Sequence, residues 1–112
     1  MTVIEMNEGA KIPYEIEGNK LSLNDDLIIN LAKRESDFPE HIDVCSDKDG
    51  NLVIGDGGLY FVAQVDIPAR EYTETETEST GEGEETTIVR EPVAFDIDKC
   101  TLTLWKIENY II

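Results

Sequence analysis

Residues 59–73 read LYFVAQVDIPAREYT and form the longest β-like segment of the chain. Apolar and polar side chains alternate along it, as expected for a strand whose successive side chains point to opposite faces of a sheet. The pattern therefore predicts a long strand at this point of the chain. One predicted face carries Leu59, Phe61, Ala63, Val65 and Ile67, and the other carries Tyr60, Val62, Gln64 and Asp66.

The predicted partner of this strand is residues 86–97, TTIVREPVAFDI, because the two segments flank a polar stretch symmetrically. Together they predict a long protruding β-hairpin. Pro68 and Pro92 lie at similar distances from its tip, and we expect each at an edge position or bulge, since proline cannot donate to a ladder. The predicted apolar face of the second segment carries Val89, Val93, Phe95 and Ile97.

The hairpin tip is acidic. Residues 71–85 contain seven glutamates and no basic residue, and such a segment buries too little apolar surface to offset its ordering entropy. We expect residues 73–86 to form a mobile acidic hairpin tip in the isolated protein. Three interpretations stay open: a solvated tip, a contact arm that orders on a basic partner or a neighbouring subunit, and mimicry of nucleic-acid charge.

Two shorter hairpins are predicted upstream. Residues 11–23 alternate through Ile12, Tyr14 and Ile16, turn at Gly18-Asn19, and resume with Leu21 and Leu23. In the second hairpin, Ile42 and Val44 precede a Lys-Asp-Gly-Asn tip at residues 48–51, and Leu52 and Ile54 follow it. Gly55, Gly57 and Gly58 then mark a turn or bulge before the longest strand.

A single short helix is predicted between these hairpins. Asn24 provides a capping side chain, Asp25 and Asp26 supply acids for the first turn, and Lys33-Arg34 supply bases for the last. Leu27, Ile28 and Leu31 recur at helical spacing. We expect this apolar stripe to pack on a sheet.

Residues 100–107, CTLTLWKI, are rich in threonine and large apolar residues and predict a central or near-central strand after an Asp98-Lys99 turn. The pattern as a whole indicates one domain spanning residues 1–112. We predict a mainly β fold: an antiparallel barrel or sandwich of about seven strands with one short α-helix and the protruding hairpin.

The chain carries nine Lys and Arg against twenty-five Asp and Glu, a net charge of −16. This charge repels nucleic-acid phosphates and anionic membrane surfaces but permits basic protein partners. The N-terminus has no basic region followed by an apolar run, so the sequence predicts no secretion signal. No run of 18 apolar residues occurs, so it predicts no membrane-spanning helix. We therefore expect a cytoplasmic protein. Cys45 and Cys100 lack a paired spacing and predict two reduced thiols, with a single bridge as the alternative.

No pattern in the chain indicates catalysis, and we predict a non-enzymatic protein without cofactor or metal. Asp47, Asp49 and Asn51 have the spacing of calcium ligands, but glycine stands at the fourth position of that loop and no glutamate at the twelfth. A turn explains these residues better. His41 and Cys45, four residues apart on one predicted strand, lie about 13 Å apart along it and form no catalytic pair.

The sequence LYFVAQVDIPAREYTE at 59–74, the acidic spacer, and REPVAFDIDKCTLTLWKIE at 90–108 resemble small proteins encoded among the structural genes of prophages in Gram-positive bacteria. The resemblance covers roughly the C-terminal half and carries over no functional residue. It implies a role in phage or prophage assembly, in a virion-associated subunit that contacts itself or a neighbour through strand edges and the hairpin.

We accordingly expect protein partners, and a homo-oligomer is one form they can take. Lys11, Lys20, Arg70 and Arg90 are candidates to pair with acids on adjacent copies. The alternative is an acidic inhibitor or regulator that occupies a basic groove on a nucleic-acid enzyme. Without the seven glutamates of the arm, the net charge would change from −16 to −9, so the acidity is spread over the whole chain. The candidate interaction residues are Arg70, Glu71, Tyr72, Glu74, Glu76, Glu78 and Arg90.

Overall fold

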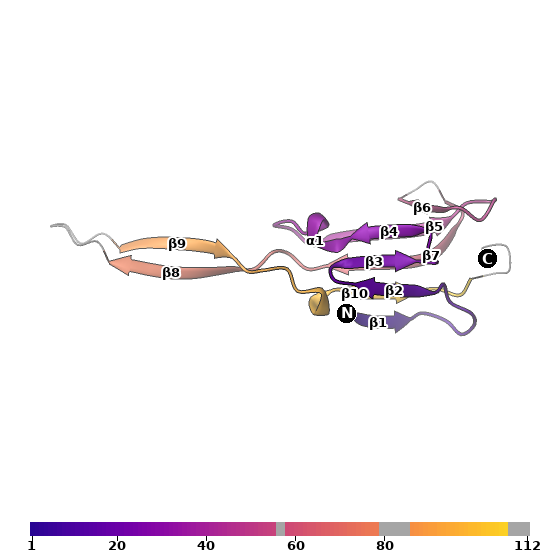
Figure 1. The fold of residues 1–112 in the computed structure, drawn as a ribbon, viewed down its shortest axis with the longest axis horizontal. Helices are drawn as coiled ribbons and strands as arrows, with labels where there is room; N and C mark the ends of the chain where they lie inside the picture. The colour runs from indigo at the N-terminus through magenta and orange to yellow at the C-terminus, as the bar shows by residue number, and fades with distance from the viewer. Residues whose placement is uncertain (56–57, 79–85, 108–112) are drawn as a thin grey trace.

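The computed structural model of the protein describes residues 1–55, 58–78 and 86–107, and for residues 76–78 and 86–87 it describes the backbone alone. The molecule measures 72 × 23 × 22 Å and has a radius of gyration of 19.5 Å. A compact chain of this length would have a radius of gyration of about 13 Å. Figure 1 shows the reason: a two-stranded arm extends lengthwise from a layered body.

The body consists of two sheets. The larger has five strands in the order β1 (Thr2–Glu5), β10 (Thr101–Leu104), β7 (Tyr60–Ile67), β5 (Glu40–Ser46) and β6 (Leu52–Ile54). The smaller has β2 (Tyr14–Glu17), β3 (Lys20–Leu23) and β4 (Leu27–Asn30). A short helix, α1 (Leu31–Arg34), follows β4, and a 3-10 turn, η1 (Ile97–Lys99), precedes β10.

The two sheets pack face to face as a sandwich around one apolar core (Figure 1). Leu21, Leu23 and Ile29 of the small sheet are 1% exposed or less, as are Val44, Val65 and Leu102 of the large one. Burying each side chain of this size contributes about 1.5 to 3 kcal/mol. The mainly β fold is thus confirmed in its sandwich form, and the sheets do not close into a barrel.

Most strand pairs are antiparallel, but β1 runs parallel to β10, with Thr2 opposite Thr101. The sequence pattern did not predict β1, and the described residues form ten strands rather than about seven. The last strand, β10, lies between β1 and β7. Its predicted place near the centre of the sheet is confirmed.

Both short hairpins are confirmed. Strands β2 and β3 pair across Gly18-Asn19, and β5 and β6 pair across the turn at residues 47–51. Gly58 permits a close approach before β7, because an added Cβ would lie 2.1 Å from the Cβ of Cys45.

The predicted helix is present but much shorter than expected. Asn24 and Asp25 have φ angles of 54° and 52° and form the turn between β3 and β4; asparagine and aspartate tolerate this left-handed conformation. The following residues form strand β4, so Ile29 is buried whereas Ile28 is 65% exposed. The actual N-cap is Asn30, whose side chain accepts a hydrogen bond from the Lys33 backbone N–H.

The inner face of β7 is predicted correctly for Ala63, Val65 and Ile67, and wrongly for two residues. The register passes from Val44 opposite Ala63 to Cys45 opposite Phe61, so a bulge interrupts the alternation. As a result Val62 and Ala63 are both buried, whereas Phe61 is 48% and Leu59 65% exposed.

We predicted that residues 59–73 pair with residues 86–97. Only the end of the first segment, from Tyr72 onward, pairs in this way. β7 ends before Pro68 and pairs with β5 and β10. A separate strand, β8 (Tyr72–Glu78), forms the hairpin with β9 (Thr86–Pro92). Pro68 has no backbone N–H to donate to a neighbouring strand, so the ladder ends before it. Val93, Phe95 and Ile97 follow β9 outside any strand, and Phe95 and Ile97 pack against the core.

Candidate interaction arm

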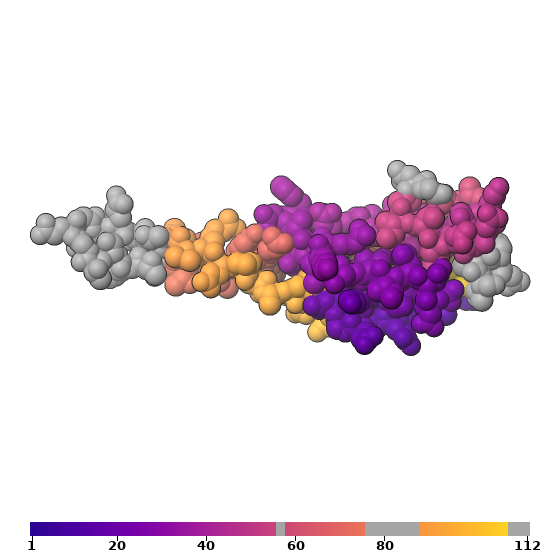
Figure 2. Space-filling view, turned by 45° about the horizontal axis from the view of Figure 1, so that its top comes forward, coloured from indigo at the N-terminus to yellow at the C-terminus, as the bar shows by residue number. Residues whose placement is uncertain are grey.

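The candidate functional site is the arm, defined as β8 and β9, together with the segments that hold it on the body. The seven-residue ladder runs from Tyr72 opposite Pro92 to Glu78 opposite Thr86. Ile88 and Val89 are 57% and 39% exposed, and in Figure 2 the arm leaves the body with no other element covering it. A two-stranded hairpin by itself is marginally stable in water, so the arm depends on contacts at its base.

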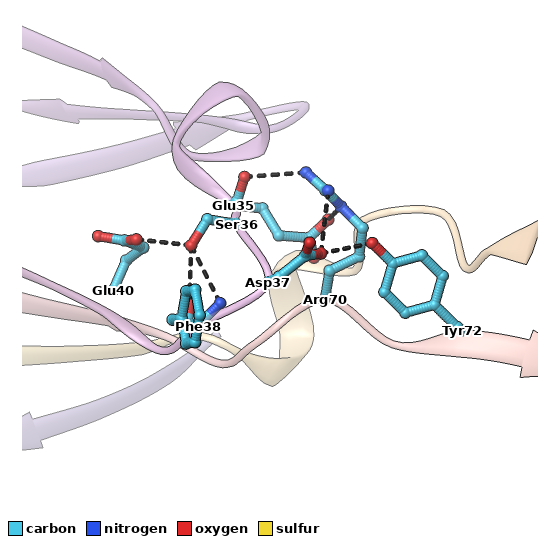
Figure 3. Close-up of polar contacts among 7 residues, drawn as sticks. All are labelled: Glu35, Ser36, Asp37, Phe38, Glu40, Arg70 and Tyr72. Carbon is cyan, nitrogen blue, oxygen red and sulfur yellow. Dashed lines mark hydrogen bonds and ion pairs between the residues drawn. The ribbon is translucent and has the colours of Figure 1, made fainter.

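Arg70 makes the first of these contacts (Figure 3). Its Nε donates to Glu35 Oε1 at 3.3 Å, its Nη1 to Asp37 Oδ1 at 3.3 Å, and its Nη2 to the Glu35 carbonyl at 3.0 Å. The Arg70 backbone N–H donates to the Ser36 carbonyl at 2.7 Å. A planar guanidinium with several fixed donors suits this task, and it fastens the start of the arm to the loop after α1.

Tyr72, the first residue of β8, adds a second link to the same loop. Its hydroxyl donates to Asp37, and the two side chains point toward one another in Figure 3. Hydrogen bonding with Tyr72 also raises the pKa of Arg70, with a smaller contribution from Glu35. These contacts favour the charged form of Arg70, and an arginine side chain is charged at neutral pH in any case.

The returning segment is joined to the outgoing one through Glu71. Lys99, in η1, donates from Nζ to Glu71 Oε2 at 2.6 Å, and this bond raises the pKa of Lys99. The Val93 backbone N–H donates to the Glu71 carbonyl at 2.8 Å. We call Glu35, Asp37, Arg70, Glu71, Tyr72 and Lys99 the arm root.

Arg90 connects the two strands just beyond the root. Its guanidinium carbon lies 4.4 Å from the centre of the Tyr72 ring, a cation–π contact. Its Nε lies 3.8 Å from Glu74 Oε1. Both contacts are exposed to solvent, so they orient the side chains at the start of the ladder without burying them.

The structure thus brings together four of the predicted interaction residues, Arg70, Glu71, Tyr72 and Arg90, with Glu74 beside Arg90. Glu76 and Glu78 lie in β8, and their side chains are outside the described part of the chain, as are residues 79–85 of the predicted mobile tip. The predicted tip segment begins within the ladder, since residues 73–78 and Thr86 are paired.

Sequence reasoning missed Glu35, Asp37 and Lys99. These residues lie about thirty positions from their partners, in segments without regular periodicity. The hollow at the root has a volume of about 20 Å³, room for roughly one water molecule. The described contacts of the root join the arm to the body.

The calcium-like spacing at residues 47–51 is a turn. Asp47 Oδ1 accepts from the backbone N–H groups of Asp49 and Asn51, each at 2.9 Å, and Oδ2 accepts from the Asn51 amide at 3.2 Å. These hydrogen bonds, that from the Asn51 backbone foremost, lower the pKa of Asp47. Its carboxylate is already engaged in closing the turn. Among the described residues, no group of three potential metal ligands occurs.

His41 lies in a polar network on the large sheet. Its Nδ1 is 2.5 Å from Asp66 Oδ1 and its Nε2 is 2.7 Å from Asp43 Oδ1. Gln64 donates to Asp43 at 2.9 Å and accepts from the Trp105 indole N–H at 3.0 Å. The network crosses β5 and β7 to the residue after β10 and holds these neighbours together.

The network shifts the pKa values of two of its members, His41 and Asp43. The hydrogen bond to Asp66 is the main reason that the pKa of His41 is raised. The bond from Gln64 is the main reason that the pKa of Asp43 is lowered. Cys45 and Cys100 are both buried and no disulfide joins them, as predicted. Burial raises the pKa of Cys100, which lowers the reactivity of that thiol.

Comparison with protein-family models, with curated proteins and with solved structures gives no match for this chain. Within the described ranges, neither helix has the length and apolar character needed to cross a bilayer. The arm and its root therefore have to be interpreted from their own geometry.

Proposed function

We propose that this protein is a non-enzymatic structural subunit of a phage or prophage assembly, and that the arm contacts a neighbouring subunit. The observation that carries the proposal is the arm itself: an exposed two-stranded ladder, fixed to the body by the arm root, whose described part projects from the body. The resemblance of residues 59–74 and 90–108 to small proteins encoded among prophage structural genes supports it.

An exposed arm with a fixed direction is well suited to binding a neighbouring subunit, for two physical reasons. Both edges of a two-stranded ladder present unpaired N–H and C=O groups, which pair readily with another chain. The ionic contacts at the root fix the direction in which the arm leaves the body, so less orientational freedom is lost on contact. An arm of this kind suits repeated contacts in symmetric assemblies.

The test compares molar mass across a range of protein concentrations by light scattering, for the intact chain and for a variant in which residues 73–86 are replaced by a short Gly-Ser turn. We expect the intact chain to form a defined oligomer and the variant to remain a monomer. Because the apolar core lies in the body, circular dichroism should show a folded protein in both cases.

A second variant, with only residues 79–85 replaced by glycine and serine at equal length, retains the described ladder and separates its contribution from that of the tip. A strict monomer in all three proteins would contradict self-assembly through the arm. It would favour the alternative, an acidic regulator that binds a basic groove on another protein.

A further inference from the structure

The basic residues of the chain are distributed unevenly between the arm root and the body. Arg70 and Lys99 bind acids at the root and Arg90 pairs with Glu74. Lys20, Lys33 and Arg34 are exposed and form no ion pair with any described residue. Lys11, Lys48 and Lys106 also form no ion pair with a described residue. What distinguishes Lys20, Lys33 and Arg34 is that they lie together, at the start of β3 and in α1.

Two of these three cations line one groove. Lys20 and Lys33 border a shallow hollow of about 600 Å³ between the β2–β3 turn and α1, together with Asn19, Asn30 and a single acid, Glu17. The local fold explains the arrangement. Lys20 lies opposite Asn30 in the ladder, and the Leu31 N–H donates to the Asn19 carbonyl at 2.9 Å, which sets the helix against the turn.

The occupant that fits this groove by charge is an acidic strand, and the chain itself contains one. The Glu74 side chain is 63% exposed, Glu76 and Glu78 occupy further alternate positions of β8, and residues 71–85 contain no base. The protein's own arm does not line the groove and leads away from the body (Figures 1 and 2). An arm in this groove must therefore belong to a second copy.

We infer that the acidic arm of one copy docks in the Lys20–Lys33 groove of the next. This inference rests on the proposed function and names the surface that receives the arm. The contact joins two different surfaces of the same protein, so it is head-to-tail, and it produces a ring or a filament according to whether the rotation closes. At physiological salt, charges separated by more than about 8 Å are screened, so the close Glu–Lys pairs outweigh the distant repulsion between two acidic chains.

The test is a charge exchange between the two surfaces. The groove variant is K20E/K33E, and the arm variant is E74K/E76K/E78K. We expect each variant alone to remain monomeric at concentrations where the wild-type protein associates, with an increase of at least tenfold in the apparent Kd. An equimolar mixture of the two should recover a complex, because the basic arm of one variant meets the acidic groove of the other.

The matched control is K48E/K106E, which makes the same charge change as the groove variant. Lys48 lies in the β5–β6 turn and Lys106 follows β10, at the end of the body opposite the arm (Figure 1). This control should associate like the wild-type protein. Circular dichroism establishes that every variant is folded.

The possible failures are distinguishable. A wild-type protein that stays monomeric contradicts the proposed function. If the wild-type protein associates through the arm and K20E/K33E associates equally well, the proposed function stands and the groove is the wrong surface. A folded pair of variants that fails to form the mixed complex also contradicts docking in this groove.

Discussion

The body and the arm are both built from short, mostly antiparallel strands, yet different interactions hold them. In the body, β7 and β10 contribute residues such as Val65 and Leu102 to a core with no exposed surface. In the arm, β8 reads Tyr-Thr-Glu-Thr-Glu-Thr-Glu and no second layer covers it. The difference shows that alternation alone predicts a strand, whereas the apolar content of its two faces decides whether the strand is buried in a core or remains exposed.

The largest expected difference between the two regions is in the response to truncated apolar side chains. L102A should lower the free energy of unfolding by about 2 to 5 kcal/mol, because it leaves a cavity in the core. I88A in the arm, where the side chain is 57% exposed, should change it by less than about 0.5 kcal/mol. Urea denaturation measures both. Equal losses would show that the arm is part of the cooperative core.

Substitutions that add side-chain volume should also lower stability more in the body than in the arm. G58A places a Cβ 2.1 Å from the Cβ of Cys45, and overpacking of this kind costs about 1 to 3 kcal/mol. T75I, which adds volume at an exposed arm position, should be within about 0.5 kcal/mol of the wild-type protein. Thermal and urea unfolding provide the comparison. A neutral G58A would mean that the turn before β7 is not packed as described.

Weakening the arm root should destabilise the strands of the arm and leave those of the body unchanged. R70M removes the bonds to Glu35 and Asp37, so amide hydrogens of β8 and β9 should exchange several-fold faster while those of β7 and β10 are unchanged. K48M, which removes an exposed cation with no described ion pair, is the control. An arm that exchanges at the wild-type rate in R70M would show that Arg70 does not fasten it.

Within the body, the smallest effect is expected from His41. Because its pKa is raised above 6.5, its contribution to stability is full below that value and is lost as the pH rises through the higher folded-state pKa. H41Q should therefore lie closest to wild-type stability at about pH 8 and furthest below it near pH 6. The difference should be under about 1 kcal/mol, since the side chain is 48% exposed. A difference that grows with pH would contradict the network.

Local signals explain why much of the fold was predictable. Gly18-Asn19 and Asp49-Gly50 fixed two hairpins, and the Thr-Leu alternation of β10 indicated a buried strand. The Asn24-Asp25 pair suits both a helix cap and a left-handed turn, and only the packing of Ile29 decides between them. β1 and the partners of β7 depend on pairing between distant segments, which periodicity does not specify.

The candidate site was predictable to the same degree. The acidic run and the bases beside it indicated Arg70, Glu71, Tyr72 and Arg90, which the structure brings together. Glu35 and Asp37 reach Arg70 from 35 and 33 residues away, so they had no local signal. The Lys20–Lys33 groove likewise depends on contacts between separate segments, among them the hydrogen bond from Leu31 to Asn19.

The most direct test of the central claim, that the body folds alone and the arm makes contacts, is hydrogen exchange of the unaltered protein at increasing concentration. We expect amides of β7 and β10 to be protected throughout, and those of β8 and β9 to exchange quickly at low concentration and to become protected as the molar mass rises. Arm amides whose exchange does not change while the protein associates would contradict the claim, as would arm amides protected like the core in the monomer.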